Sequence, residues 1–216
     1  MLLAPPMFGF SVNDLEIARM LGADPSCLRV ASRGTRAATL STADLWRDVR
    51  RVADALGVPE RGVQFITRCR HRLRAISDRA ATRPRCRVAL LLGSGAPAPA
   101  WRAELLAFAA ADDALAGSLS VSLGALALAD PDDIVIAPSG ADLARARDSL
   151  AARVDSRAWR ALRAVREGRV FFADGRTSFA RPDAHVAETL EVLAEALHPE
   201  AFRFGHRGRL WELWAA

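Results

Sequence analysis

The sequence predicts an α/β protein, with a Rossmann-like parallel sheet in its C-terminal lobe, long helices before it and a short N-terminal segment. Three compact apolar runs, at residues 87–92, 134–137 and 170–173, predict the strands of the sheet. Proline or glycine bounds these runs, and segments of helical periodicity separate them. Strands that alternate with helices form a parallel sheet wrapped by helices.

The pattern divides the chain into four parts. Residues 1–41 hold a predicted helix at 11–22 and a candidate strand at 28–31, and they are interpreted as the remnant of an N-terminal lobe. Residues 42–83 are a helical spine and residues 84–200 form the sheet-bearing lobe. Residues 201–216 are an aromatic tail that contains Phe202, Phe204, Trp211 and Trp214.

The spine contains two predicted helices. In the first, Leu45, Val49, Val52 and Leu56 recur every three to four residues, which predicts one buried side. The second runs from Pro59 to about residue 82 and carries arginines on its polar side: Arg68, Arg70, Arg72, Arg74 and Arg79. Two interpretations explain these arginines equally well: the helix is a spine between two lobes, or its arginines are the solvated face of an ordinary helix.

The C-terminal lobe has four predicted helices between and after its strands. One opens near Trp101, and the others cover 142–152, 157–166 and 183–197. Pro138-Ser139-Gly140 and Asp174-Gly175 are predicted sharp turns, each directly after a strand.

Composition excludes several classes of protein. The chain has 216 residues, 51% of them hydrophobic, and a net charge of +5 that comes from arginine because the sequence has no lysine. Arginine is interleaved with Asp and Glu along the helices, which disfavours nucleic-acid binding. The sequence contains no run of about 20 apolar residues, so it does not predict a membrane-spanning helix.

The cysteines and the N-terminus favour a cytoplasmic protein. Cys27, Cys69 and Cys86 are far apart and have no metal-ligand spacing, so we expect reduced thiols and no metal site. The apolar N-terminus lacks the basic region of a signal peptide.

Catalytic signatures are also missing, so the sequence predicts a protein that is not an enzyme. It has no GxSxG, P-loop, HExxH or GxGxxG motif. The acid pairs Asp112-Asp113 and Asp132-Asp133 are interpreted as helix caps and turns. His185, the histidine nearest to the predicted cleft, is interpreted as a surface residue at a helix N-terminus rather than a cobalt ligand.

Three segments carry a family resemblance: residues 129–143, 159–175, and 178–182 with 188–202. In this order they resemble the cobalamin-binding branch of the helical-backbone (class III) substrate-binding proteins of ABC transporters. Residues 101–105, Trp-Arg-Ala-Glu-Leu, resemble the Trp-x-Pro-Glu-Leu turn of that family, and residues 42–73 resemble its interlobe helices.

The resemblance implies two Rossmann-like lobes with a ligand held between them. Members of the family are often periplasmic or extracytoplasmic. This sequence departs from the family at several places. Its N-terminal lobe is abbreviated, and Ser139 and Ala141 replace the Cys and Phe of a Pro-Cys-Gly-Phe turn. Ala180 stands before Arg181, where transporter-dependent members carry a docking acid.

A corrinoid ligand needs aromatic faces and hydrogen-bonding groups near the ends of strands. The residues that meet this need are Trp101, Ser139, Gly140, Phe179 and Arg181. The backbone N–H groups of Ser139 and Gly140 are expected to face the ligand. Each position also has a purely structural interpretation: core packing for Trp101, a tight turn at Ser139-Gly140, and a self-packed loop for Phe179 and Arg181.

The leading hypothesis is non-catalytic binding of cobalamin or a related small-molecule chelate, with an ABC transporter as a candidate partner. The alternative is a degenerate lobe that acts as a scaffold or regulatory protein without a ligand, through self-association or another partner. An exposed aromatic tail would favour the alternative. We expect instead that the tail folds back over the sheet, because an uncovered edge strand is prone to aggregation.

Overall fold

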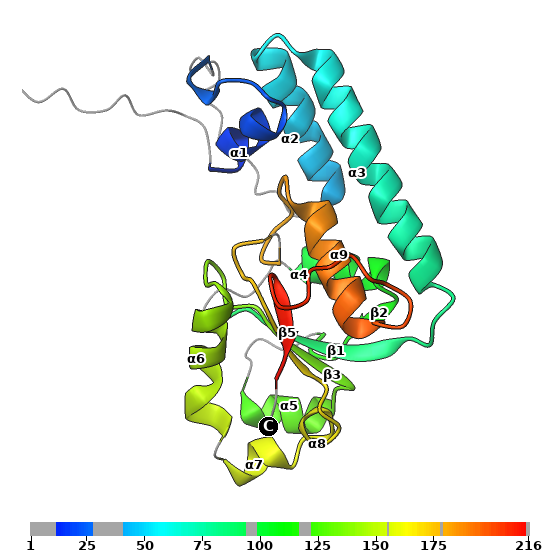
Figure 1. Cartoon of the computed structure of the whole chain (residues 1–216), viewed down its shortest axis with the longest axis vertical. Helices are drawn as coiled ribbons and strands as arrows, with labels where there is room; N and C mark the ends of the chain where they lie inside the picture. The colour runs from blue at the N-terminus through cyan, green and yellow to red at the C-terminus, as the bar shows by residue number, and fades with distance from the viewer. Residues whose placement is uncertain are drawn as a thin grey trace, which may run out of the picture.

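The protein, seen here in a computed structural model, contains a five-stranded, mostly parallel sheet covered by helices (Figure 1). The structure describes residues 12–27, 41–93, 99–116, 122–154, 156–177 and 179–214. The predicted α/β class is therefore confirmed, while the candidate strand at 28–31 lies outside the described residues.

The strands lie in the order β2-β1-β3-β4-β5. The bounds of the parallel strands are Cys86–Leu91 for β1, Ala111–Asp113 for β2, Asp133–Ile136 for β3 and Val170–Ala173 for β4. The fifth strand, β5, covers Trp211–Leu213 and pairs with β4 in the antiparallel direction. All residues of β3 and β4 are buried, as expected of central strands with helices on both faces.

Helices of the N-terminal half and α9 lie on one face of the sheet. Their bounds are Val12–Met20 for α1, Thr42–Ala55 for α2, Pro59–Ala80 for α3, Pro99–Phe108 for α4 and Val186–Leu197 for α9. The hydroxyl of Ser41 caps α2 by accepting from the Asp44 N–H, and Pro59 begins α3. Together with residues of all five described strands, these helices form one continuous apolar core.

Four further helices of the described residues cover the opposite face and form a second core around Trp159. They are α5 Leu123–Ala129, α6 Leu143–Val154, α7 Arg157–Arg160 and α8 Arg163–Arg166. The predicted single helix over 157–166 is thus two helices, because Leu162 takes an extended ψ of 138° between them. A short 3-10 turn, Pro25–Cys27, follows α1.

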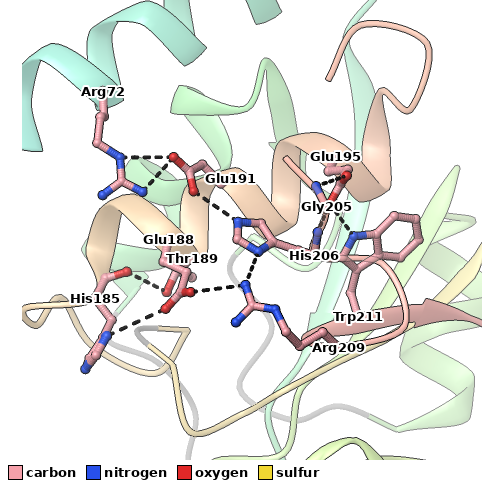
Figure 2. A network of polar contacts seen from close by, with 10 residues as sticks. All are labelled: Arg72, His185, Glu188, Thr189, Glu191, Glu195, Gly205, His206, Arg209 and Trp211. Atoms are coloured by element: carbon pink, nitrogen blue, oxygen red, sulfur yellow. Dashed lines mark hydrogen bonds and ion pairs between the residues drawn. The ribbon is translucent and has the colours of Figure 1, made fainter. Parts of the chain in front are cut away.

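The aromatic tail folds back onto the lobe, as expected. Trp211 is 3% exposed and meets Phe171 of β4 edge to face, with ring centroids 5.9 Å apart. A single carboxylate on α9 holds the tail: Glu195 accepts hydrogen bonds from the Trp211 indole (2.9 Å), the Gly205 N–H (2.9 Å) and the His206 N–H (3.0 Å) (Figure 2). Burial by itself raises the pKa of Glu195, but these hydrogen bonds outweigh it and hold the pKa below its ordinary value.

No helix in the described ranges has both the length and the apolar character needed to cross a bilayer.

Candidate functional site

The candidate site lies where the central parallel strands end. Two turns meet at this edge of the sheet: residues 137–142 follow β3, and residues 174–177 follow β4. The segment from β4 to α9 then passes between α6 and α9 (Figure 1). In parallel sheets, ligands bind at this carboxyl edge because loops from neighbouring strands converge there.

Backbone hydrogen bonds join these turns into one rigid unit. The Ser139 N–H donates to the Leu92 carbonyl (3.1 Å), which ties the β3 turn to the end of β1. The Gly140 N–H donates to the Gly175 carbonyl (2.9 Å), and the Gly175 N–H donates to the Ala141 carbonyl (2.8 Å). The two turns therefore cannot move independently without losing these hydrogen bonds.

Gly175 allows the close approach of the two turns. A Cβ atom at this position would lie 1.9 Å from the carbonyl oxygen of Pro138, a distance at which the backbone would have to move. Gly140, on the other turn, has a φ of +76°, which favours glycine. The Asp-Gly and Ser-Gly pairs in the sequence are thus required by the site's backbone.

An ion pair fixes the turn after β4. Asp174 is 3% exposed and accepts from the Arg176 N–H (2.9 Å) and from the Arg176 guanidinium (2.5 Å). Burial tends to raise the pKa of Asp174, but the Arg176 contacts outweigh it and lower the pKa below its ordinary value. The carboxylate therefore stays ionised near neutrality and is saturated by donors. The sequence predicts Asp174-Gly175 only as a turn, and nothing in the local pattern indicates the ion pair between the buried Asp174 and the exposed Arg176.

The structure places the two predicted aromatic residues inside the core. Trp101 of α4 is 0% exposed and Phe179 is 1% exposed. Both belong to the core cluster on the α9 face of the sheet. A ligand at the strand ends cannot contact either ring unless the core opens.

The predicted roles of Ser139 and Gly140 also need correction in one respect. Their backbone N–H groups were expected to face the ligand, but both already donate to carbonyls of the neighbouring loops. What remains accessible is the partly exposed Ser139 side chain, whose Oγ lies 3.4 Å from the Leu92 carbonyl oxygen, and the exposed Gly140 backbone surface.

Arg181 is the predicted residue with the greatest freedom to contact a ligand. It is exposed in the segment that leads to α9, and no ion pair links it to any carboxylate of the described residues. His185 lies four residues further on as the N-terminal cap residue of α9, with Nδ1 3.7 Å from Glu188. Within the described ranges, no three His, Cys, Asp or Glu side chains converge as metal ligands.

Comparison with solved structures identifies the fold. A periplasmic heme-binding protein from Pseudomonas aeruginosa superposes with a TM-score of 0.67 and 24% identity, over 83% of this chain and 67% of that one. An ABC transporter substrate-binding protein from Listeria monocytogenes gives 0.63 and 16%, over 74% and 66%. A molybdate periplasmic binding protein from Haemophilus influenzae gives 0.58 and 18%, over 74% and 50%. No protein-family model and no curated protein matches the chain.

These likenesses define the class of fold: the chain has the fold of the periplasmic binding proteins that serve ABC transporters, a class that includes TroA-like members. The α/β fold with a mostly parallel sheet, expected for the C-terminal lobe, is confirmed. The chain spans between half and about two thirds of the length of the three proteins compared above.

Proposed function

We propose that this protein binds, without chemical conversion, a small metal-containing ligand with anionic oxygen atoms at the carboxyl edge of its sheet. The observation that carries the proposal is the hydrogen-bonded pair of turns, 137–142 and 174–177, followed four residues along the chain by Arg181, which is exposed and has no ion pair among the described residues. Preformed backbone with a few accessible polar groups is typical of small-molecule sites.

The chemistry of the ligand class follows from Arg181 and from the structural neighbours. The neighbours are described as binding heme and molybdate. A heme has carboxylates, molybdate is an oxyanion and cobalamin contains a phosphodiester, so all three present anionic oxygens that a guanidinium binds well. Corrinoids, including cobalamin, therefore belong to the proposed class together with porphyrins.

Direct ligand contacts are assigned to Arg181, the Ser139 hydroxyl and the Gly140 backbone surface. Trp101 and Phe179 are assigned an indirect role, because both rings are buried in the core. Binding without catalysis fits the state of Asp174, since a carboxylate already saturated by Arg176 is a poor proton donor or acceptor.

A scaffold role without a ligand is less well supported. That alternative would be favoured by an exposed aromatic tail, whereas Trp211 is buried and Trp214 packs against the second core. An ABC transporter partner remains part of the proposal. The neighbours are described as periplasmic proteins, and a cytoplasmic location for this chain stays a prediction.

The test is a titration of the purified protein with cobalamin, hemin and molybdate, followed by visible absorbance for the two coloured ligands and by calorimetry for all three. We expect saturable one-to-one binding of at least one of them. Arg181→Gln should weaken it by about tenfold, the loss of roughly one charge-assisted hydrogen bond.

The matched control is Arg166→Gln, which removes an exposed arginine on α8 at the far end of the lobe and should leave affinity unchanged. Absence of saturation by all three ligands at about 100 μM, equivalent to binding weaker than roughly −5.5 kcal/mol, would contradict the proposal.

A further inference from the structure

Positive charge is concentrated in one short part of the chain. Residues 68–87 contain eight arginines and a single acid, Asp78, for a net charge of +7. The whole chain carries +5, so the remaining residues together carry −2. Charges are interleaved in the chain as a whole, but not in this stretch, most of which is the C-terminal half of α3.

The tail brings further arginines to the same surface. Its loop after α9 runs beside the C-terminal half of α3 (Figure 1), and the Arg79 guanidinium lies 5.4 Å from the ring centre of Phe202. We define the basic–aromatic face as eight of the exposed residues of these two segments. They are Arg68, His71, Arg72 and Arg79 of α3 with Arg203, Phe204, Arg207 and Arg209 of the tail.

A polar network fixes the two halves of this face to each other (Figure 2). Arg72 donates to Glu191 (2.6 Å), and the other oxygen of Glu191 lies 3.0 Å from His206 Nε2. Arg209 donates to His206 Nδ1 at 2.8 Å. Since a guanidinium can only donate, Nδ1 must accept, so Nε2 carries the proton and donates to Glu191.

Much of the charge on the face is uncompensated. Glu191 and Glu188 balance Arg72 and Arg209. Arg68, Arg203 and Arg207 are exposed and have no ion pair with a carboxylate of the described residues. Between α3 and the tail lies a hollow of about 220 Å³, with Ile76 and Phe202 among its apolar lining. The side chains of Arg72, Arg79 and His71 also line it.

Phe204 distinguishes between the anionic partners that such a face could bind. It is 40% exposed and has two aromatic neighbours: Phe202 is stacked on it, with ring centroids 5.7 Å apart and an interplanar angle of 19°, and His206 lies tilted to it at 6.2 Å and 30°. A nucleic-acid base stacks on a free ring face, and a base on Phe204 would have to compete with these two ring neighbours. The exposed ring edge instead suits the interfacial zone of a bilayer, where aromatic side chains lie among lipid headgroups.

We propose that the basic–aromatic face binds peripherally to the surface of an anionic lipid bilayer, with guanidinium groups on lipid phosphates and the edge of Phe204 at the headgroup level. Basic clusters bind such surfaces through several weak charge contacts that act together. Arginine also matches the geometry of phosphate oxygens. This surface role is independent of ligand binding at the carboxyl edge of the sheet.

The experiment is co-sedimentation of the full chain with vesicles of phosphatidylcholine and phosphatidylglycerol in a 3:1 ratio, and with pure phosphatidylcholine vesicles (about 0.05 M salt, where screening is weak). We expect binding only to the anionic vesicles, and its loss at about 0.5 M salt. The triple variant Arg68→Gln, Arg203→Gln, Arg207→Gln should bind roughly 100-fold more weakly, since each arginine contributes about fivefold. Phe204→Ser should lower binding several-fold.

The control variant removes the same charge elsewhere, as Arg145→Gln, Arg157→Gln, Arg166→Gln on α6, α7 and α8. It should bind like the unmodified protein, and circular dichroism should show that all variants fold. Equal loss in the control, equal binding to pure phosphatidylcholine, or no vesicle binding would each overturn the proposal. Binding to a single-stranded oligonucleotide in place of vesicles would overturn it in favour of a nucleic-acid partner.

Discussion

At the scale of single residues, the candidate site depends on backbone more than on side chains. Gly175 is the clearest case, because the position of its missing Cβ is already occupied by the carbonyl group of Pro138. The turns after β3 and β4 can exchange hydrogen bonds only at this separation. Side chains that contact a ligand can vary, but the contact between these turns cannot accept even a methyl group.

We therefore expect Gly175→Ala to lower the free energy of unfolding by about 3 kcal/mol, because the Pro138 carbonyl belongs to the backbone and cannot rotate away. The measurement is chemical denaturation followed by circular dichroism. The matched control is Gly124→Ala in α5, where an added Cβ would lie 3.8 Å from its nearest neighbour, Ser122 Oγ. That variant should be unchanged or up to about 1 kcal/mol more stable. Equal stability of the two variants would contradict the close contact.

At the scale of elements, the sequence predicts the central strands and long helices well. The runs at 134–137 and 170–173 correspond to β3 and β4 within one residue, since buried parallel strands are continuous apolar runs. The edge strands were not predicted. Strand β2 has three residues, two of them aspartate, and β5 lies in a segment whose aromatic residues indicated only an apolar surface. Short edge strands are defined by their partners, which lie far away in the sequence.

The candidate site was predictable to the same extent. The position of the candidate site could be predicted from the topology, because Ser139, Gly140 and Arg181 follow the strands that define the carboxyl edge of the sheet. The burial of Trp101 and Phe179 could not be predicted from topology. Whether these side chains point to a cleft or to the core depends on helices from other parts of the chain. A single sequence does not contain that three-dimensional information in its local pattern.

The attachment of the tail to α9 gives a prediction at this scale. Glu195→Gln should cost about 1–3 kcal/mol near pH 7, because an amide has one accepting oxygen for three donors and no charge. Folding lowers the pKa of Glu195, so its carboxylate contributes stability that is complete above the ordinary glutamate pKa. That contribution is lost as the pH falls through the lowered pKa of the folded state.

The difference in stability between the unmodified protein and Glu195→Gln should accordingly shrink as the pH falls below about 4.5. Thermal unfolding measured from pH 7 to pH 3 tests this dependence. Glu200→Gln, an exposed residue just after α9, serves as the control and should show no comparable difference. If the difference in stability between Glu195→Gln and the unmodified protein stays constant with pH, the carboxylate does not hold the tail.

At the scale of the whole molecule, the core is shared between parts that the sequence suggested were separate. One apolar cluster includes Ile17 of α1, Leu73 of α3, Val88 of β1 and Leu190 of α9. It crosses the predicted boundary at residue 83, between the spine and the C-terminal lobe. Helices α2 and α3 therefore depend on the sheet and α9 for burial, and the sheet depends on them.

A shared core predicts that the helical spine and the C-terminal lobe unfold together. Leu73, 3% exposed on α3, is a direct probe, and Leu73→Ala should cost about 2–5 kcal/mol through lost burial and the cavity that remains. Far-UV circular dichroism and tryptophan fluorescence should report one coincident transition in both proteins, shifted to lower denaturant in the variant. Val63→Ala, on the same helix but at a 58% exposed position, should shift it by no more than about 0.5 kcal/mol. Two separate transitions, with only the helical one shifted by Leu73→Ala, would mean that the spine folds independently and that the shared core does not couple it to the site.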